Sequence, residues 1–229
     1  MLRDSVVCVV IIRAPSDLVR MSNSIQASGR IVIPAGTLLY WELTLSGRKN
    51  ADSRRELNVR ALSPGSADAA VKTVIDESFA GYVNHYSYNR LLDSHLVAAG
   101  YREWAERSMS SPDAIGLVLE DGGVPVGIAT ARNWRDKDVL EIELAGIVSS
   151  RQGEGLYRAL IDGVTREGLA LGVSRIAIST QSQNLSVQRA WALLTPTENR
   201  ASNARRFQAA LKGHESVFSR SRRLTHSMP

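Results

Sequence analysis

The spacing of apolar residues changes character near residue 56 of this 229-residue chain. Before that point, apolar runs at 6–12, 30–33 and 37–45 are interrupted by proline and glycine, a pattern typical of short strands and turns. After it, runs with a period of two alternate with runs that repeat every three to four residues. The pattern predicts strands at 56–62, 114–120, 124–134, 139–149 and 175–180, and helices after Ser66 and at 90–108, 155–171 and 185–194.

This order of elements predicts an α+β fold. A strand, two helices, three strands, a helix, a strand and a helix suit a mixed, largely antiparallel sheet flanked by helices. We expect residues 56–195 to form this domain and residues 1–55 a small N-terminal β-rich subdomain. Residues 196–229 would form a basic tail.

Positive charge is concentrated in that tail. The chain carries a formal charge of +5, but residues 199–229 hold seven Lys or Arg and one Glu, which leaves residues 1–198 at −1. A basic tail can contact phosphates or anionic lipid, but a solvated, disordered end is the commoner case. We therefore expect no nucleic-acid partner.

The small number and the spacing of cysteine and histidine residues exclude a disulfide-stabilised fold and a metal site. The single cysteine, Cys8, rules out an intramolecular disulfide framework, and the four histidines lack metal-ligand spacing, so no metal is expected. The apolar run at 6–12 is too short to span a bilayer, and no cleavage signature follows it. We expect a cytoplasmic protein without a membrane span.

The candidate chemistry lies where the strand at 139–149 meets the helix at 155–171. The connection contains Gln152-Gly153-Glu154-Gly155-Leu156-Tyr157. A helix start offers unpaired amide N–H groups and partial positive charge, and glycine allows close approach to that backbone. The turn therefore favours a diphosphate cradle, with a simple strand–helix turn as the alternative. It lacks the residues of a Walker loop and the third glycine of a dinucleotide fingerprint.

This connection resembles motif A of the GNAT acetyltransferases, Gln/Arg-x-x-Gly-x-Gly/Ala, with Gln152 first and Gly155 fourth. Asn184 resembles the Asn of a later family motif, so the resemblance covers residues 56–195. It implies transfer of an acetyl group from acetyl-CoA, a cosubstrate, to a primary amine of a small molecule. The groups that would bind the cosubstrate belong to Ile147, Val148, Gln152, Gly153, Gly155, Leu156, Tyr157 and Asn184.

Two glutamates are candidates for the base that deprotonates the amine. Glu141 and Glu143 lie two residues apart on the strand before the turn and so share one face, while Leu140, Ile142 and Leu144 face the core. Members of the family often place a base glutamate in this region, and Glu141 fits the spacing better. The alternative for each is a solvated or ion-paired strand carboxylate.

The acceptor site is expected beside the loop at 80–89. Tyr82, His85 and Tyr86 would stack on and hydrogen-bond to a polar ring, unless the loop is only an ordered surface segment. Residues 1–55 also resemble the N-terminal half-domain of dTDP-fucosamine-type amino-sugar acetyltransferases. That resemblance implies a nucleotide-linked amino sugar as acceptor.

The sequence departs from the family pattern in the same region. Tyr157 stands where the family has a small residue, and Trp191 where it commonly has the Tyr that protonates the departing thiolate. Thr195-Pro196 replaces a usual Gly-Phe, and the final two strands are not evident in the sequence. A non-catalytic acyl-CoA-binding or interaction module is therefore the alternative. The pattern allows a homodimer but does not specify one.

Overall fold

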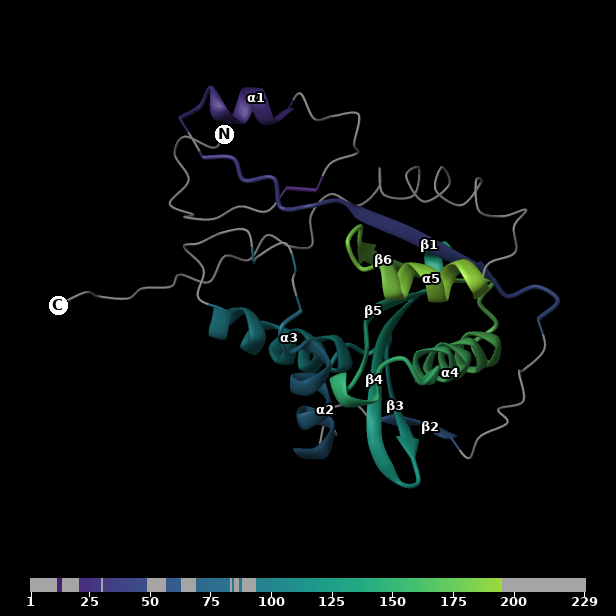
Figure 1. The fold of residues 1–229 in the computed structure, drawn as a ribbon. Helices are drawn as coiled ribbons and strands as arrows, with labels where there is room; N and C mark the ends of the chain where they lie inside the picture. The colour runs from purple at the N-terminus through teal and green to yellow at the C-terminus, as the bar shows by residue number, and fades with distance from the viewer. Residues whose placement is uncertain are drawn as a thin grey trace. The chain divides into compact units, whose positions relative to one another are not determined.

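The computed structural model describes residues 12–13, 21–29, 31–48, 57–62, 69–82, 84, 87 and 94–194. The chain divides into two compact units, one of residues 1–34 with 204–229 and one of residues 35–203. In the first unit the described secondary structure is the helix α1, Met21–Gln26. The rest of this section concerns the second unit (Figure 1).

The second unit follows the predicted order of elements. Its strands are β1 Leu38–Thr44, β2 Leu57–Leu62, β3 Ala114–Asp121, β4 Val124–Trp134, β5 Val139–Ile147 and β6 Arg175–Gln181. Its α-helices are α2 Ala69–Phe79, α3 Ser94–Met109, α4 Leu156–Ala170 and α5 Leu185–Leu194. Two 3₁₀ turns, η2 Arg135–Lys137 and η3 Ser149–Arg151, flank β5.

The six strands form one sheet in the order β1-β6-β5-β4-β3-β2. Every neighbouring pair is antiparallel except β5 and β6, which are parallel and joined by α4. The predicted α+β fold with a mixed, largely antiparallel sheet is therefore confirmed.

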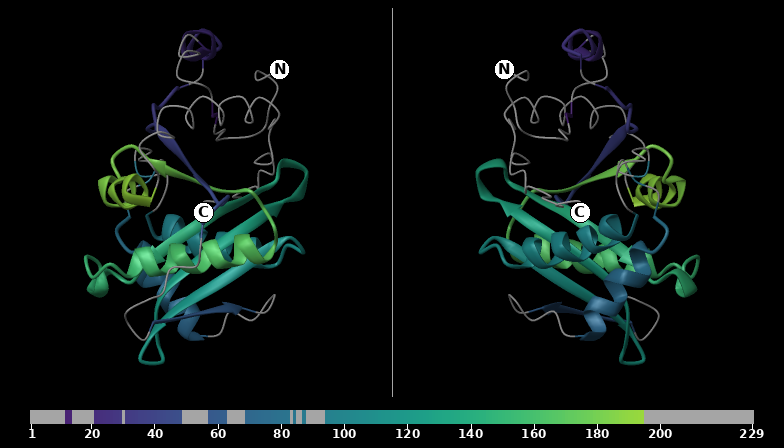
Figure 2. Two further views of the ribbon diagram at one scale, coloured as in Figure 1. Left: turned by 90° about the vertical axis from the view of Figure 1, so that its right-hand side faces the viewer. Right: turned by 90° about the vertical axis from the view of Figure 1, so that its left-hand side faces the viewer.

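Helices cover both faces of the sheet. α4 crosses one face, and α2 and α3 lie on the other, as the two views in Figure 2 show. α4 presents Leu156, Leu160, Ile161 and Val164 to the core, all with exposed fractions of 1% or less. On α2, Val71, Val74 and Ile75 are buried in the same way. The three-to-four-residue spacing of these apolar side chains explains why both segments form helices.

The strand β1 corrects the predicted division of the chain. Residues 37–45 were assigned to the N-terminal subdomain, but β1 pairs with β6 along its whole length, from Leu38 opposite Gln181 to Thr44 opposite Arg175. Leu43 is fully buried in the main core. Of the predicted strand at 30–33, the described residues 31–33 form no regular element. The predicted boundaries after residues 55 and 195 lie outside the described residues.

Two properties of the described residues concern membrane spans and metal sites. None of their helices is long and apolar enough to cross a membrane. They also hold no group of three or more His, Cys, Asp or Glu side chains arranged to bind a metal ion.

Candidate active site

The two parallel strands of the sheet, β5 and β6, stop pairing halfway along their length. Pairing between β5 and β6 runs from Val139 opposite Arg175 to Ile142 opposite Ile178 and then stops. Both strands nevertheless continue: β5 stays paired with β4 to Ile147, and β6 with β1 to Gln181. The backbone N–H and C=O groups on the β6 side of β5 are therefore released from the sheet ladder along the second half of β5.

The direction of the released groups follows from strand geometry. The N–H of Val148 donates to the carbonyl oxygen of Val126 (3.0 Å), so the backbone of Val148 faces β4. Neighbouring residues of a strand direct their backbone groups to opposite sides, so Ile147 and Ala145 direct theirs toward β6. Of the two residues predicted to bind the cosubstrate through backbone groups, Ile147 has the suitable direction. The N–H of Val148 is already engaged.

A β-bulge interrupts β5 at one of the candidate bases. Thr130 of β4 lies opposite Leu144 and Ala131 opposite Ile142, which leaves Glu143 as the extra residue. Bulges re-aim side chains and end regular pairing. The bulge begins where the ladder to β6 stops, so both irregularities fall at the same level of the sheet.

Both glutamates project from the face that carries α2. The register of the paired strands places Ile142, Ala131 and Val59 on the same face of the sheet. Since α4 packs against Val59, this is the face that carries α4. Glu141 lies opposite Arg132 and projects from the other face. Leu140, Ile142 and Leu144 are buried and both glutamates are half-buried. The predicted alternation is wrong at Leu144, because the bulge at Glu143 places Leu144 opposite Thr130, on the other face of the sheet from Ile142.

The two glutamates have different partners. Glu141 accepts a hydrogen bond from Trp134 Nε1 (2.8 Å), whereas Glu143 forms an ion pair with Arg132 (3.1 Å). Three buried oxygen atoms on this side, Glu143 Oε2, Thr130 Oγ1 and Ser78 Oγ, have no hydrogen-bond partner within the described structure. Buried polar atoms are normally satisfied, so each of these three oxygens has unused hydrogen-bonding capacity.

The glycine turn at the start of α4 requires both of its glycines for conformational reasons. Gly153 and Gly155 have φ values of +86° and +79°, a region that L side chains rarely adopt. A Cβ atom at either position would meet nothing within 4 Å, so the space around the turn is open. Gly155 caps α4 without a side-chain hydrogen bond, and no acidic residue lies in the first turn. The amides of Gly155, Leu156 and Tyr157 thus form a positively polarised helix end.

Two side chains hold this turn in place. Gln152 Nε2 donates to the carbonyl oxygen of Ile147 (3.1 Å), which closes the turn onto the end of β5. Arg151 binds both carboxylate oxygens of Glu154 (2.7 and 2.8 Å) and reaches Asp121 at the end of β3 (2.6 Å). Hydrogen bonds with Glu154 and Asp121 raise the pKa of the Arg151 guanidinium. The acidic charge of Glu154 is thereby neutralised beside the helix end.

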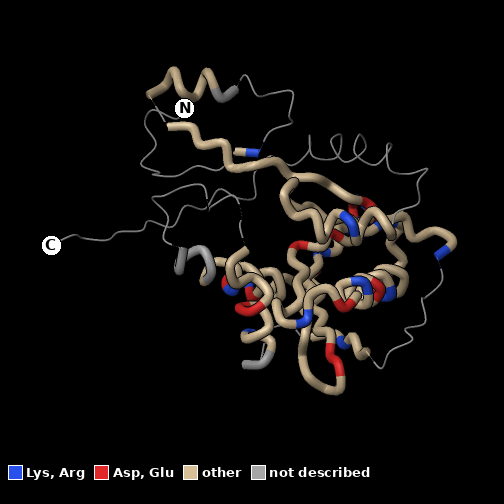
Figure 3. The backbone as a smooth tube through the Cα atoms, in the orientation of Figure 1, with Lys and Arg blue, Asp and Glu red and all other residues tan. Residues whose placement is uncertain are grey.

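Charges along α4 are interspersed rather than segregated (Figure 3). Arg158 pairs with Asp162 one turn later (3.3 Å), and Arg166 precedes Glu167. The positive character of the turn therefore comes from backbone amides.

Asn184 has a structural role at the start of α5. Its side-chain oxygen accepts a hydrogen bond from the N–H of Val187 (3.3 Å), as an N-cap residue does. The predicted contact of Asn184 with the cosubstrate stays a prediction.

Two of the residues that depart from the family pattern, Tyr157 and Trp191, contact each other. Trp191 of α5 is fully buried, and its Nε1 donates to the hydroxyl oxygen of Tyr157 on α4 (3.2 Å). Burial raises the pKa of the Tyr157 phenol, and the nearby Tyr82 raises it further, while the hydrogen bond from Trp191 acts in the opposite direction.

The loop after α2 is described in part. The ring of Tyr82 packs edge-on against Phe79 (6.3 Å between centroids) and Tyr101 (6.0 Å). Tyr82 therefore belongs to an aromatic cluster at the α2–α3 layer. His85 and Tyr86 lie outside the described residues.

Sequence reasoning missed several residues of this region. The roles of Arg151 and Asp121 in fixing the turn, and of Trp134 and Arg132 beside the glutamates, were not predicted. The adjacency of Arg151 to the motif, and the hairpin position of Asp121, were the available signals.

The model of the Acetyltransferase (GNAT) family matches residues 71–194, more than half of the chain. The match includes β5, the glycine turn and α5. No curated protein matches the chain in sequence.

Solved structures resemble the chain at low identity. The GCN5-related N-acetyltransferase from Sphaerobacter thermophilus is 17% identical, with a TM-score of 0.49, over 74% of this chain and 51% of that one. PaiA N-acetyltransferase from Thermoplasma acidophilum, solved in complex with coenzyme A, is 15% identical, with a TM-score of 0.47, over 60% and 87%. AAC(6')-Iy in complex with the bisubstrate analogue CoA-S-monomethyl-acetylneamine is 15% identical, with a TM-score of 0.45, over 73% and 99%.

Proposed function

Because the chain belongs to the GNAT acetyltransferase family, we propose that it transfers the acetyl group of acetyl-CoA to a primary amine. The observation that carries the proposal is the coincidence of two features. The β5–β6 ladder ends at Ile142, and the glycine turn at the head of α4 directly follows the released part of β5.

The backbone of this region fits a long molecule that has a diphosphate at one end and amide groups along an arm. The amides of Gly153, Gly155, Leu156 and Tyr157 would hold the diphosphate, because they lie at the positive end of α4 and the turn is open. The N–H of Ile147 would donate to the arm in place of the missing β6 ladder, because the Ile147 carbonyl oxygen already accepts a hydrogen bond from Gln152. The two glycines support this role, since L side chains rarely adopt their φ values.

The carboxylates of β5 would act on the amine. Glu141, directly or through one water, would take a proton from the attacking amine, and Trp134 would hold the carboxylate in position (2.8 Å). Glu143 is the second candidate base, although its ion pair with Arg132 favours a positioning role. A base is needed because only the neutral amine is nucleophilic.

The acceptor would approach from the α2 face. The unsatisfied oxygens of Glu143, Thr130 and Ser78 offer hydrogen bonds there, and Tyr82 offers an aromatic surface. These groups suit a polyhydroxylated amine, which supports a nucleotide-linked amino sugar with contacts to Tyr82, His85 and Tyr86.

Isothermal titration with acetyl-CoA tests the cosubstrate. Mass spectrometry of acetyl transfer to amino sugars, nucleotide-linked amino sugars, polyamines and peptides then tests the reaction and the acceptor. We expect micromolar binding and acetylation of amino sugars. Absence of binding at high micromolar acetyl-CoA would refute the proposal, and acetylation of peptides alone would refute the acceptor class.

One observation favours a second function. Trp191 has replaced the expected Tyr and is fully buried, so position 191 offers no acidic proton. A non-catalytic acyl-CoA-binding module would bind CoA without acetylating any amine of the panel. Turnover with any amine excludes it.

A further inference from the structure

An arginine lies directly opposite the first candidate base. Arg132 of β4 pairs in register with Glu141 of β5, and both side chains project from the face that carries α2. The Cβ atoms of directly opposed residues in an antiparallel pair are about 5 Å apart. An acceptor whose amine meets the Glu141 carboxylate therefore places its neighbouring groups beside Arg132.

The guanidinium of Arg132 is held at its inner end. Its Nε lies 3.1 Å from a carboxylate oxygen of Glu143. The contact has the length of an ion pair but not the direction of a hydrogen bond, because Nε is buried without a hydrogen-bond partner among the described residues. The side chain as a whole keeps 27% of its exposure, so the accessible part lies outside the buried Nε.

The accessible part includes the two terminal nitrogens of Arg132. Neither Nη1 nor Nη2 is enclosed as Nε is, and no described residue accepts a hydrogen bond from them. The N–H groups of a guanidinium form a planar fork that matches the oxygens of a carboxylate or a phosphate. The outer edge of Arg132 is therefore a donor site for an oxyanion.

Trp134 orients this guanidinium and brings a second cation to it. The guanidinium carbon of Arg132 lies 5.4 Å from the centroid of the Trp134 ring, and Nζ of Lys137 lies 4.7 Å from it. The same indole donates its Nε1 hydrogen to Glu141 (2.8 Å). One side chain thus contacts the candidate base and two positive charges, so an acceptor at this place meets both signs of charge at once.

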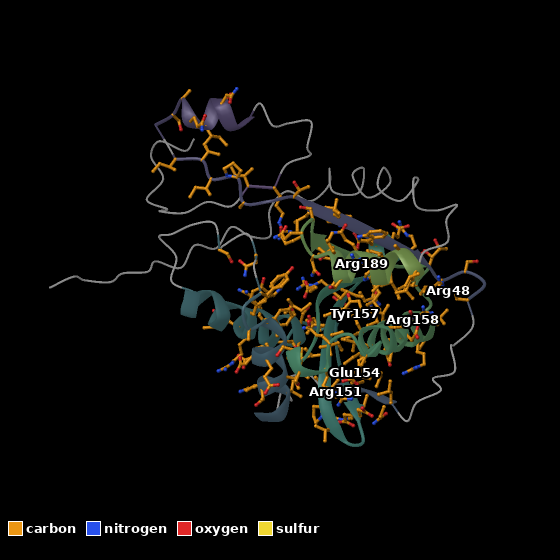
Figure 4. All side chains as sticks on the ribbon, viewed as in Figure 1. Arg48, Arg151, Glu154, Tyr157, Arg158 and Arg189 are labelled. Atoms are coloured by element: carbon orange, nitrogen blue, oxygen red, sulfur yellow. The ribbon has the colours of Figure 1, made fainter. Side chains whose placement is uncertain are left out.

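The arginines near the glycine turn lie on the other side of the sheet. Figure 4 shows Arg151 at the turn and Arg158 on α4, and α4 covers the face opposite to α2. Both are engaged by carboxylates, Arg151 by Glu154 and Asp121 and Arg158 by Asp162. Positive charge on the acceptor side comes instead from Arg132 and Lys137.

We propose that Arg132, with Lys137 beside it, binds an anionic group of the acceptor, a phosphate or a carboxylate that lies close to the amine. This inference rests on the proposed function and narrows its acceptor class. A nucleotide-linked amino sugar carries such a phosphate. A polyamine would instead bring further positive charge to the two cations.

Matched acceptors test the anionic group directly. Glucosamine is compared with glucosamine 1-phosphate, with UDP-glucosamine and with 2-amino-2-deoxyglucuronic acid, and spermidine serves as the polycation. We expect kcat/KM for the best anionic sugar to exceed that for glucosamine by about tenfold or more, because a site built to bind a polar group rejects the analogue that lacks it. Spermidine should be the poorest acceptor. The phosphate and carboxylate arms show which anion the site takes, and a preference for either supports the proposal.

Arg132→Gln removes the charge and keeps a side chain that hydrogen-bonds. The ratio of kcat/KM between the best anionic sugar and glucosamine should fall about tenfold, mainly through KM. A general loss of structure lowers both values alike, so the ratio reports recognition and not stability. Arg132→Lys should keep part of the ratio, because lysine keeps the charge without the fork. If Arg132→Gln does not fold, the ratio in Arg132→Lys decides.

Arg60→Gln is the matched control, because it removes the arginine of a similar ion pair, with Glu120 (2.9 Å), between β2 and β3. It should leave the ratio unchanged. Circular dichroism and the melting temperature report whether each variant folds.

The unmodified chain is assayed first, so that the two proposals fail separately. If it acetylates no amine, the proposed function is wrong and the anion subsite falls with it. If it acetylates glucosamine or spermidine as well as the best anionic sugar, the proposed function stands and the role of Arg132 is wrong. An unchanged ratio in Arg132→Gln, or an equal fall of the ratio in Arg60→Gln, would also overturn that role.

Discussion

Arg151 connects the glycine turn to the β3–β4 hairpin, because its guanidinium lies 2.6 Å from a carboxylate oxygen of Asp121 while it also binds Glu154. The side chains of Arg151 and Asp121 retain 29% and 20% of their exposure, so water screens this pair only in part. The turn is thus held by a residue outside its own sequence, Asp121.

We predict that Asp121→Asn weakens cosubstrate binding more than it weakens the fold. The turn would lose its contact to the hairpin, so its amides would be ordered only on binding. We expect KM for acetyl-CoA to rise about three- to tenfold, while the free energy of unfolding changes little, as for other partly exposed ion pairs. Steady-state kinetics and urea unfolding measure the two effects.

Asp113→Asn is the matched control, because it removes the more exposed ion pair between Asp113 and Arg135 (3.4 Å). That variant should leave KM unchanged. Equal KM values in both variants would show that the pair of Arg151 with Asp121 does not support the turn.

The two β5 glutamates should respond differently to neutralisation. We expect Glu141→Gln to lower kcat/KM about 100-fold at pH 7 and much less at high pH, where the amine is already neutral. Glu143→Gln leaves Arg132 without its carboxylate, so it should reduce thermal stability and lower kcat equally at all pH values. A pH–rate profile from pH 6 to 10 separates the outcomes. If Glu143→Gln alone shows the recovery at high pH, Glu143 is the base.

The local pattern of apolar and polar residues was sufficient to predict most helices and strands of the main domain. The predicted helix 185–194 coincides with α5, and the alternation on β5 correctly separated Leu140 and Ile142 from Glu141. These elements carry their signal in residues a few positions apart. The glycine turn was predictable for the same reason, because positive φ values favour glycine wherever they occur.

Pairing between distant segments was not predictable. β1 was assigned to the wrong part of the chain because its partner β6 begins more than 130 residues later. The contact of Tyr157 with Trp191 was missed in the same way. Each residue departs from the family pattern, but their spacing does not show that one side chain donates to the other. The early end of the β5–β6 ladder also depends on backbone geometry that single residues do not reveal.

Asp138 should make stability depend on pH in the acid range. It sits in the left-handed region (φ +53°), and its carboxylate accepts a hydrogen bond from the N–H of Ser174 (2.9 Å). Hydrogen bonds from Ser174 hold the pKa of Asp138 below its usual value. A lowered pKa means that the stabilisation is present above the unfolded-state value, about 3.9, and is lost as the pH falls through the folded-state value.

We therefore predict that Asp138→Asn is less stable than the unmodified chain at pH 7 and that the difference narrows as the pH falls below about 4. Asn tolerates the left-handed conformation, so the change isolates the charge. Urea unfolding at pH 7, 5 and 3.5 measures it. Asp136→Asn, an exposed neighbour on η2, should show no such narrowing. A difference that persists unchanged at pH 3.5 would contradict the assignment.

Substitution of glycine by alanine should have opposite effects on the stability of the protein in helices α3 and α4. Gly100 of α3 is exposed, and a Cβ atom there would meet nothing within 4 Å, so Gly100→Ala should stabilise by about 0.5–1 kcal/mol. Gly163 of α4 lies against β2, where a Cβ atom would clash with Val59 Cγ1 and lie 3.0 Å from its Cβ. Val59 is β-branched and stiff, so α4 must move. Gly163→Ala should destabilise by about 1–3 kcal/mol.

Movement of α4 would also shift the amides at its start, since the helix is one rigid element. We therefore expect Gly163→Ala to raise KM for acetyl-CoA, and the double variant with Val59→Ala to recover part of the affinity by making room for the new methyl group. Urea unfolding and titration with acetyl-CoA give both quantities. If Gly163→Ala is as stable as Gly100→Ala, α4 does not pack on β2 as closely as the contact with Val59 requires. If the double variant restores neither quantity, the cause lies elsewhere than at Val59.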